Sequence, residues 1–313
     1  MYPDWLLRAE FFSFGLIFGS FLNVCIYRLP RGLSVISPRS ACPECHFPIA
    51  GFDNIPVLSW LILRGRCRHC HTRINPRYAV VELVCGLLFL FSFLRAESPV
   101  DAVKGCVLCF LFLGLTFTDA ETHLLPDAMT LTGLGMGLIF SGFSLVPGPV
   151  YQLFPLAFQQ TPTHLQIDIQ LGLRSFGNAL LGAAIGSGLL YAAAAVYLKL
   201  RKVEGLGFGD VKLMALAGAF LGPVLTLFVL CTASVLGGAY GMLILLTVFQ
   251  KRLTRYRPRL GARAVARAWQ AAQVAMQGLE LPFGVFLSIM SMVTWFYGMQ
   301  MVRAYLRIFQ IHL

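Results

Sequence analysis

Long apolar segments, each close to the length that crosses a lipid bilayer, limit most strongly how this chain can fold. A helix rises about 1.5 Å per residue, so about 20 apolar residues cross the roughly 30 Å of bilayer hydrocarbon. The sequence therefore predicts an all-α polytopic membrane protein with about eight transmembrane helices. The predicted spans are residues 11–27, 78–94, 103–118, 128–146, 176–198, 211–221, 224–249 and 283–302.

Composition supports this class. Of 313 residues, 57% are hydrophobic, 14 are acidic and 25 are Lys or Arg, whereas a soluble domain of this size carries about twice that charge. The first span lacks a small-residue cleavage site, so we expect it to be retained and not removed as a signal peptide. Residues 211–249 form one apolar stretch, and Gly222-Pro223 is its expected break because proline cannot continue a helix.

Basic residues predict the orientation of the spans. The segment 28–77 carries eight arginines against two acids, which places it in the cytoplasm. With eight spans, the loops 119–127, 199–210 and 250–282 fall on the same side. Arg303 and Arg307, predicted outside, are the exception. This topology and anionic membrane lipid account for the net charge of +11, so no nucleic-acid partner is needed.

Four of the nine cysteines form two C-x2-C pairs, Cys42 with Cys45 and Cys67 with Cys70, separated by 21 residues. Such pairs place four thiolates around a tetrahedral zinc ion, and the usual gap is about 15 to 20 residues. A pair of disulfides or unrelated thiols is the alternative, and the reducing cytosol disfavours the disulfides. The loop has too few apolar residues for a core of its own, so we expect a small cytoplasmic domain whose structural Zn²⁺ supplies folding energy.

Other thiols and imidazoles have simpler interpretations. Four cysteines already complete a zinc shell, although the neighbouring histidines offer substitute ligands: His46, His69 and His71. The remaining cysteines lie in apolar segments and are expected to pack as small hydrophobic residues: Cys25, Cys85, Cys106, Cys109 and Cys231.

Two aspartates, Asp119 and Asp210, lie where long apolar segments meet short polar loops, and they are the best catalytic candidates. A carboxylate at the edge of hydrocarbon is costly to keep charged, so it calls for a reason. Asp119 follows the end of a helix, where the helix dipole disfavours negative charge, so capping does not explain it. Asp210 follows the glycine-rich segment 205–209, which permits close backbone approach; a helix cap is the alternative.

If the two carboxyls converge, they cannot both ionise in a desolvated site, and they share one proton. This is the arrangement of aspartic proteases, in which one carboxylate activates a water molecule and the protonated partner donates to the scissile carbonyl. Four residues are expected to support the pair. Gly207 and Gly209 allow close approach, Asp127 caps the helix that follows it, and Lys212 either tunes the pair or extends its amine to the interface.

Several motifs occur in order along the chain. They are GSFLNV at residues 19–24, YRLP at 27–30, both cysteine pairs, DNIPVLSW at 53–60, RY at 77–78 with VEL at 81–83, the segments 119–127 and 205–212, and PFG at 282–284. A chain with these motifs resembles the bacterial type IV prepilin peptidases, which are also leader peptidases and N-methyltransferases.

The resemblance implies an intramembrane aspartyl protease of the GxGD type with Asp119 and Asp210 as its catalytic pair. It implies cleavage of prepilins or pseudopilins at the cytoplasmic face of the bacterial inner membrane, then methylation of the new N-terminus with S-adenosylmethionine. The cysteine loop is associated with this bifunctional form. No nucleotide-binding motif places the S-adenosylmethionine site, for which Asp53, Asn54 and Glu82 are candidates.

The resulting domain organisation has four parts. Residues 1–28 form the first span, 29–77 the zinc domain, 78–302 the peptidase core and 303–313 a C-terminal tail. Residues 250–281 are a basic insertion, either a solvated loop or an interfacial amphipathic helix with Val265, Trp269, Ala272 and Met276 on one side and Arg259, Arg263, Arg267 and Gln270 on another.

Two rival functions remain at this point. One is a zinc-stabilised membrane transporter in which Asp119 and Asp210 relay protons. The other is a peptidase that has lost methylation.

Overall fold

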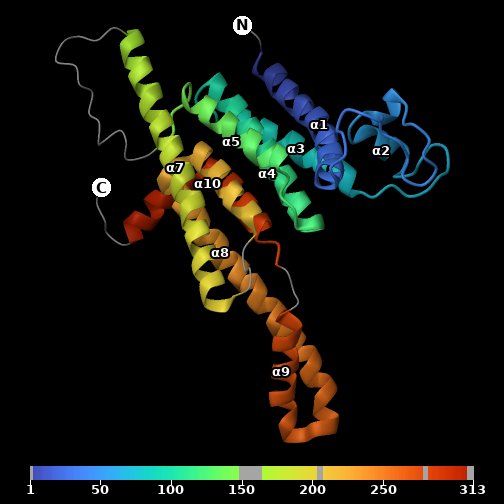
Figure 1. The fold of residues 1–313 in the computed structure, drawn as a ribbon. Helices are drawn as coiled ribbons and strands as arrows, with labels where there is room; N and C mark the ends of the chain where they lie inside the picture. The colour runs from blue at the N-terminus through green and yellow to red at the C-terminus, as the bar shows by residue number, and fades with distance from the viewer. Residues whose placement is uncertain (1–2, 148–163, 203–206, 278–280, 309–313) are drawn as a thin grey trace.

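The computed structural model describes residues 3–147, 164–202, 207–277 and 281–308, which form a bundle of helices (Figure 1). No strand occurs among these described residues, which confirms the all-α prediction. The long helices are α1 (Asp4–Arg28), α3 (Arg77–Arg95), α4 (Pro99–Thr122), α5 (Asp127–Ser141), α7 (His164–Arg201), α8 (Phe208–Leu260), α9 (Ala264–Gln277) and α10 (Phe283–Ile308). The short elements are η1 (Leu29–Arg31), η2 (Gly51–Asn54), α2 (Leu58–Ile62) and η3 (Gly261–Arg263).

Six of the described helices are long and apolar enough to cross a membrane: α1, α3, α4, α7, α8 and α10. The sequence predicts about eight spans, and two features explain the difference. Helix α5 has only 15 residues. Helix α8 joins the sixth and seventh predicted spans in one element of 53 residues. The polytopic class is confirmed.

The predicted break inside 211–249 lies at Gly222, whose backbone is non-helical with φ 76° and ψ 175°. A side chain there would be strained, and a Cβ would lie 2.2 Å from the carbonyl oxygen of Pro147. Glycine therefore lets the chain turn sharply within α8.

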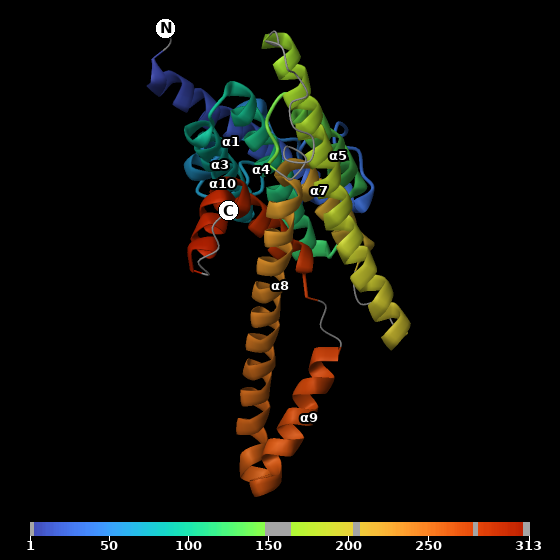
Figure 2. The ribbon, with the colours of Figure 1, turned by 90° about the vertical axis from the view of Figure 1, so that its left-hand side faces the viewer.

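The core surrounds α4, whose Leu108, Phe112 and Leu115 are fully buried. They belong to one apolar cluster with Leu22 of α1 and Met214 of α8. Helix α7 approaches the first part of α8 through small residues, since a Cβ on Gly218 would lie 2.2 Å from Gly182. Figure 2 shows α7 alongside α8. This packing fixes the ends of α4 and α8, which carry the candidate carboxyls.

The basic insertion is helical and is not the solvated loop that is one of the two predicted alternatives. Helix α8 continues to Leu260, and α9 folds back along it to form a hairpin that extends from the bundle (Figure 2). The expected apolar side of α9 contacts α8, because Ala272 is buried and the ring of Trp269 lies 5.8 Å from that of Phe249. Val265 is exposed. The side chain of Arg259 lies outside the described residues.

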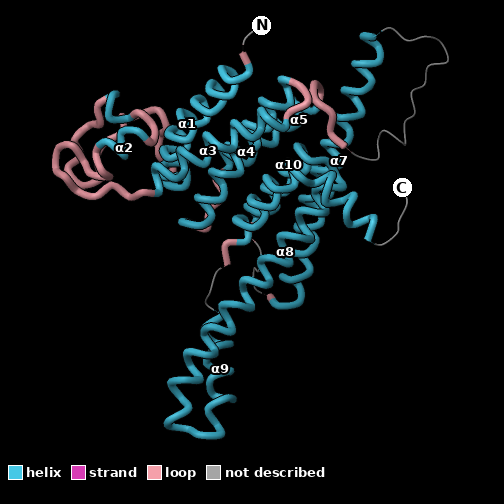
Figure 3. The backbone as a smooth tube through the Cα atoms, turned by 180° about the vertical axis from the view of Figure 1, so that it is seen from behind, coloured by secondary structure: helices cyan, strands magenta, loops and turns pink. Residues whose placement is uncertain are grey.

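Residues 29–76 form a mostly irregular lobe beside the ends of α1 and α3 (Figure 3). The lobe contains both cysteine pairs and the short helix α2. It is joined to the bundle by a hydrogen bond from the Val57 backbone N–H to the Glu82 carboxylate of α3, at 2.8 Å.

Candidate active site

Asp119 and Asp210 lie at neighbouring helix ends. Asp119 is in the last turn of α4, and Asp210 is in the first turn of α8. Both are buried, with 5% and 9% of their surfaces exposed. A buried carboxyl at the end of an apolar helix is the arrangement that the sequence predicts for both residues.

The two carboxyls converge on Gly284, in the first turn of α10. A Cβ placed on Gly284 would lie 2.9 Å from Asp119 Oδ2 and 3.2 Å from Asp210 Oδ1. The two oxygens are therefore at most 6.1 Å apart, the sum of these distances. Within this limit, one water molecule or one peptide carbonyl can lie within hydrogen-bond distance of both carboxyls.

The backbone of α10 distinguishes the two aspartates. The N–H of Val285 donates a hydrogen bond of 2.9 Å to Asp119 Oδ2. Asp119 therefore faces the positive end of the α10 dipole, which stabilises its charged form. No described residue donates a hydrogen bond to the carboxylate of Asp210. The pair is asymmetric, with Asp119 the better stabilised anion.

Gly284 and Val285 are site residues that the sequence prediction does not include among its candidates. The motif 282–284 is visible in the sequence, but a backbone N–H donor has no side-chain signature. The signal that the sequence does contain is a glycine at the start of an apolar helix, which permits the carboxyls to approach the backbone.

Adding one methyl group at Gly284 tests this geometry. We expect Gly284→Ala to reduce catalytic turnover at the pair by about 100-fold, because the methyl group occupies the space between the carboxyls and misplaces them. The measurement is a comparison of turnover at equal amounts of folded protein. Gly135→Ala in α5 is the matched control, since nothing lies within 4 Å of its added Cβ. Equal turnover of the two variants would refute the placement of Gly284.

The predicted supporting glycines lie at the start of α8. Gly207 is the N-cap residue of this helix, and a Cβ on Gly209 would meet the Leu125 side chain at 3.1 Å. Gly209 thus allows the α8 terminus to lie close to the loop after α4. Gly205, the first glycine of the motif, lies outside the described residues.

Asp127 and Lys212 have a different arrangement from the one predicted. Pro126 is the N-cap residue of α5, and Asp127 is the first residue of the helix. Its carboxylate instead accepts from Lys212 Nζ at 2.6 Å, joining α5 to α8. Asp127 is therefore not the N-cap residue that the sequence predicts, although it does place a negative charge in the first turn of α5, where the helix dipole favours it. Lys212 makes no ion pair with either buried aspartate.

The four predicted zinc ligands gather into one cluster. The Sγ atoms of Cys42, Cys45, Cys67 and Cys70 lie within 4.8 Å of one another, and no disulfide joins them. Sγ of Cys42 and Sγ of Cys70 are 3.8 Å apart. Zinc–sulfur bonds of 2.3 Å in a tetrahedron give sulfur–sulfur distances of about 3.8 Å, so the cluster fits this ion.

The two cysteine pairs fold alike. The backbone N–H of Cys42 bonds to the carbonyl of Phe47, and that of Cys67 to the carbonyl of Thr72. Hydrogen bonds from the backbone of Cys70, then of His69, lower the pKa of the Cys67 thiol to about 7. Thiolate is the form that binds metal, but the pKa of the Cys70 thiol is raised to about 12 in the same cluster, so it is the geometry of the four sulfur atoms that favours a metal site.

The three neighbouring histidines, His46, His69 and His71, do not belong to the cluster of candidate metal ligands. His69 stacks on Phe47 with ring centroids 4.6 Å apart, and this contact joins the two halves of the lobe. His46 and His71 each follow the second cysteine of a pair with positive φ.

The three candidates for cofactor binding are partly engaged in the fold. Asp53 pairs with Arg68 at 2.6 Å, and this hydrogen bond holds the pKa of the Asp53 carboxyl below its usual value. Asn54 ends the short helix η2. Glu82 binds the Val57 N–H, as described above. Asp53 and Glu82 thus have structural partners.

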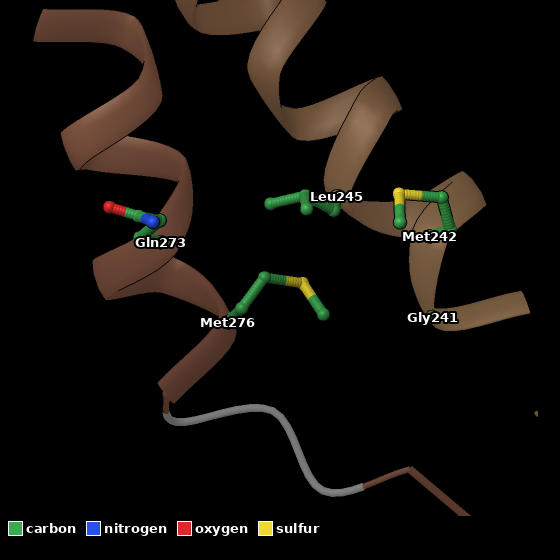
Figure 4. Close-up of a pocket in the computed structure, with 5 residues that line it drawn as sticks. All are labelled: Gly241, Met242, Leu245, Gln273 and Met276. Carbon is green, nitrogen blue, oxygen red and sulfur yellow. The ribbon is translucent and has the colours of Figure 1, made fainter. Parts of the chain in front are cut away.

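An apolar hollow of about 340 Å³ lies between α8 and α9 (Figure 4). Its lining is Gly241, Met242, Leu245, Gln273 and Met276. None of these side chains titrates, so the hollow offers no acid or base, and the carboxyl pair remains the candidate for chemistry.

The models of two protein families match the parts of the chain that contain the lobe and the site. Residues 13–96 match the model of the bacterial peptidase A24 N-terminal domain, and residues 106–242 match the type IV leader peptidase family. The first match includes all four clustered cysteines, and the second includes both aspartates. No solved structure matches the chain.

Curated relatives are similar over most of the chain. A prepilin leader peptidase/N-methyltransferase of Myxococcus xanthus is 39% identical over 77% of this chain and 64% of its own length. One from Aeromonas hydrophila is 30% identical over 96% of this chain and 94% of its own length. One from Aeromonas salmonicida is 31% identical over the same shares. The chain thus spans nearly all of the Aeromonas relatives and a little under two thirds of the Myxococcus relative.

Proposed function

Because the chain belongs to the type IV leader peptidase family, we propose that it removes the leader peptide from prepilins or pseudopilins and methylates the N-terminus so formed. The observation that carries the peptidase proposal is the convergence of Asp119 and Asp210 on Gly284. We place the reaction at the cytoplasmic face of the bacterial inner membrane. The arginine-rich segment 28–77 supports this orientation.

In the proposed mechanism, Asp119 is the general base. Its contact with the Val285 N–H and the α10 terminus favours its ionised form, which accepts a proton from a water molecule as that water attacks the scissile carbonyl. Asp210 carries the proton of the pair. It donates this proton to the carbonyl oxygen as the tetrahedral intermediate forms. As the intermediate collapses and the C–N bond breaks, the leaving amine takes the proton that Asp119 accepted, and Asp210 takes a proton back from a hydroxyl of the intermediate.

The fold suits a substrate that combines a polar leader with an apolar helix. Both carboxyls lie where apolar helices end, so the bond between leader and helix can reach them without moving the apolar part out of the membrane. The buried position of the pair limits water around the carboxyls, which strengthens their electrostatic interactions.

The cysteine cluster is proposed to hold structural Zn²⁺. The four sulfur atoms would supply all four ligands of the ion and would leave no position for a catalytic water. The ion would hold the two halves of the lobe together. The lobe contacts α3 through Val57 and Glu82, so its fold also affects the bundle.

Methylation of the new N-terminus is the second half of the proposed function. S-adenosylmethionine supplies the methyl group, and the chain must present the new N-terminal amine in its neutral form. The named relatives favour this bifunctional form over a peptidase without methylation. They also favour a peptidase over a transporter.

The function is tested with purified chain in lipid nanodiscs, a synthetic prepilin and S-adenosylmethionine with a labelled methyl group. We expect release of the leader followed by label on the mature N-terminus, since methylation needs the amine that cleavage creates. Intact prepilin after prolonged incubation would refute the peptidase assignment. Cleavage without label would refute only the methyltransferase assignment.

A further inference from the structure

Three polar side-chain atoms lack partners where α1, α3 and α4 meet. They are Asn23 Oδ1, Arg77 Nε and Arg77 Nη2, and each is buried without a hydrogen bond to a described residue. Asn23 is only 5% exposed. Buried polar groups are nearly always satisfied in native proteins, so three orphan atoms in one region point to a ligand.

Tyr78 brings Asn23 and Arg77 together. Asn23 Nδ2 donates to the Tyr78 carbonyl at 3.0 Å, which fixes the amide and leaves Oδ1 as the free acceptor. The guanidinium of Arg77 lies 5.3 Å from the centre of the Tyr78 ring. Arg77 Nη1 donates to Glu121 at 3.0 Å. The remaining Nε and Nη2 form one edge of the guanidinium, held in place from its other edge.

The chemistry of these atoms is specific. A guanidinium edge with two parallel N–H donors binds a carboxylate through two hydrogen bonds. An amide oxygen accepts from an ammonium group. Together they match the carboxylate and ammonium of an α-amino acid. The Arg77 side chain as a whole is 19% exposed, while its two orphan nitrogen atoms are buried.

We propose that Asn23 and Arg77 bind the amino-acid end of S-adenosylmethionine. The carboxylate lies on Arg77 Nε and Nη2, and the ammonium donates to Asn23 Oδ1. This inference rests on the methyltransferase half of the proposed function. Asn23 and Arg77 thus take the place of Asp53 as candidates for cofactor binding. Asp53 is paired with Arg68, whereas Asn23 and Arg77 have hydrogen-bonding atoms without a partner among the described residues.

The location suits a methyl donor. Glu121, the partner of Arg77, is two residues beyond Asp119 on α4, so the cofactor would lie within one helical turn of the catalytic residue but on a different face of α4. The cysteine lobe is also close, because Val57 bonds to Glu82 one turn of α3 beyond Tyr78. Val57 adopts φ 61°, which is strained for a β-branched residue, so the lobe must hold it there. This contact gives the lobe a direct physical link to the proposed cofactor site.

The test compares three ligands by calorimetry on purified full-length chain. S-adenosylmethionine and S-adenosylhomocysteine both carry the amino-acid group, whereas methylthioadenosine lacks it. We expect Arg77→Gln and Asn23→Leu each to weaken the first two by about tenfold or more and to leave methylthioadenosine unchanged. Arg68→Gln is the matched control, because it breaks a similar ion pair and should bind all three ligands as the unmodified chain does.

Other outcomes overturn the inference in distinguishable ways. Equal weakening of all three ligands would show a general loss of structure, and unchanged binding would place the amino-acid end elsewhere. Lost methylation with normal S-adenosylmethionine binding would assign Arg77 to the pilin. If the unmodified chain cleaves prepilin but binds none of the ligands, the inference and the methyltransferase function both fail, while the peptidase stands.

Discussion

Replacing Asp119 or Asp210 with asparagine is expected to lower the rate of leader cleavage by at least about 100-fold. Asparagine has nearly the same shape as aspartate but neither accepts nor donates the proton that the reaction moves. Because the shape is kept, each variant leaves the packing largely intact. It removes one member of a pair whose carboxyl oxygens are at most 6.1 Å apart across Gly284. The measurement is single-turnover cleavage of a prepilin by purified variants in nanodiscs.

Asp127→Asn provides the matched control for the pair. Asp127 lies near Asp119 in sequence, but its carboxylate binds Lys212 on the surface. A partly exposed ion pair of this kind contributes at most about 1 kcal/mol, so this variant should cleave prepilin at nearly the normal rate. Normal cleavage by Asp119→Asn, or equal loss in Asp127→Asn, would contradict the assignment.

Removing one cysteine of the cluster is the second change with a large expected effect. Cys42→Ser should reduce bound zinc from one ion per chain to almost none, because the other three thiolates cannot complete the shell. Zinc binding contributes about 10 to 16 kcal/mol of folding free energy in comparable small sites. The lobe at 29–76 has no large core to replace it, so we expect rapid proteolysis within these residues.

Metal analysis and limited proteolysis together check this prediction. Cys231→Ser is the control, since Cys231 is exposed on α8 and lies outside the cluster. Absence of zinc from the unmodified chain would refute the metal assignment. A protease-resistant lobe in zinc-free Cys42→Ser would show instead that the lobe folds without the ion.

Much of the fold follows from the apolar segments, because their length and composition permit only helices in a bilayer. The break at Gly222 is also readable from Gly-Pro in the sequence. The length of α5 and the path of α9 cannot be read from the sequence, since they depend on tertiary packing. Trp269 of α9 contacts Phe249 of α8 because α8 extends beyond the bundle to Leu260. The local sequence does not specify this contact between two helices.

The site divides in the same way. Asp119 and Asp210 are detectable because charge at the end of an apolar helix needs a reason, and the four cysteines because their spacing suits a metal. The meeting of the carboxyls is a property of packing, as is the pair formed by Asp127 and Lys212, which are 85 residues apart. The Val285 N–H is a backbone group and leaves no trace in residue type.

The most direct test of the proposed active site is the mass of a prepilin coexpressed with the chain in a host that lacks its own prepilin peptidase. With the unmodified chain, the mature pilin should have lost its leader and gained one methyl group at its N-terminus. With the Asp210→Asn variant, expressed at the same level, the prepilin should retain its full leader. Mature pilin produced by that variant would contradict the role of the buried aspartate pair.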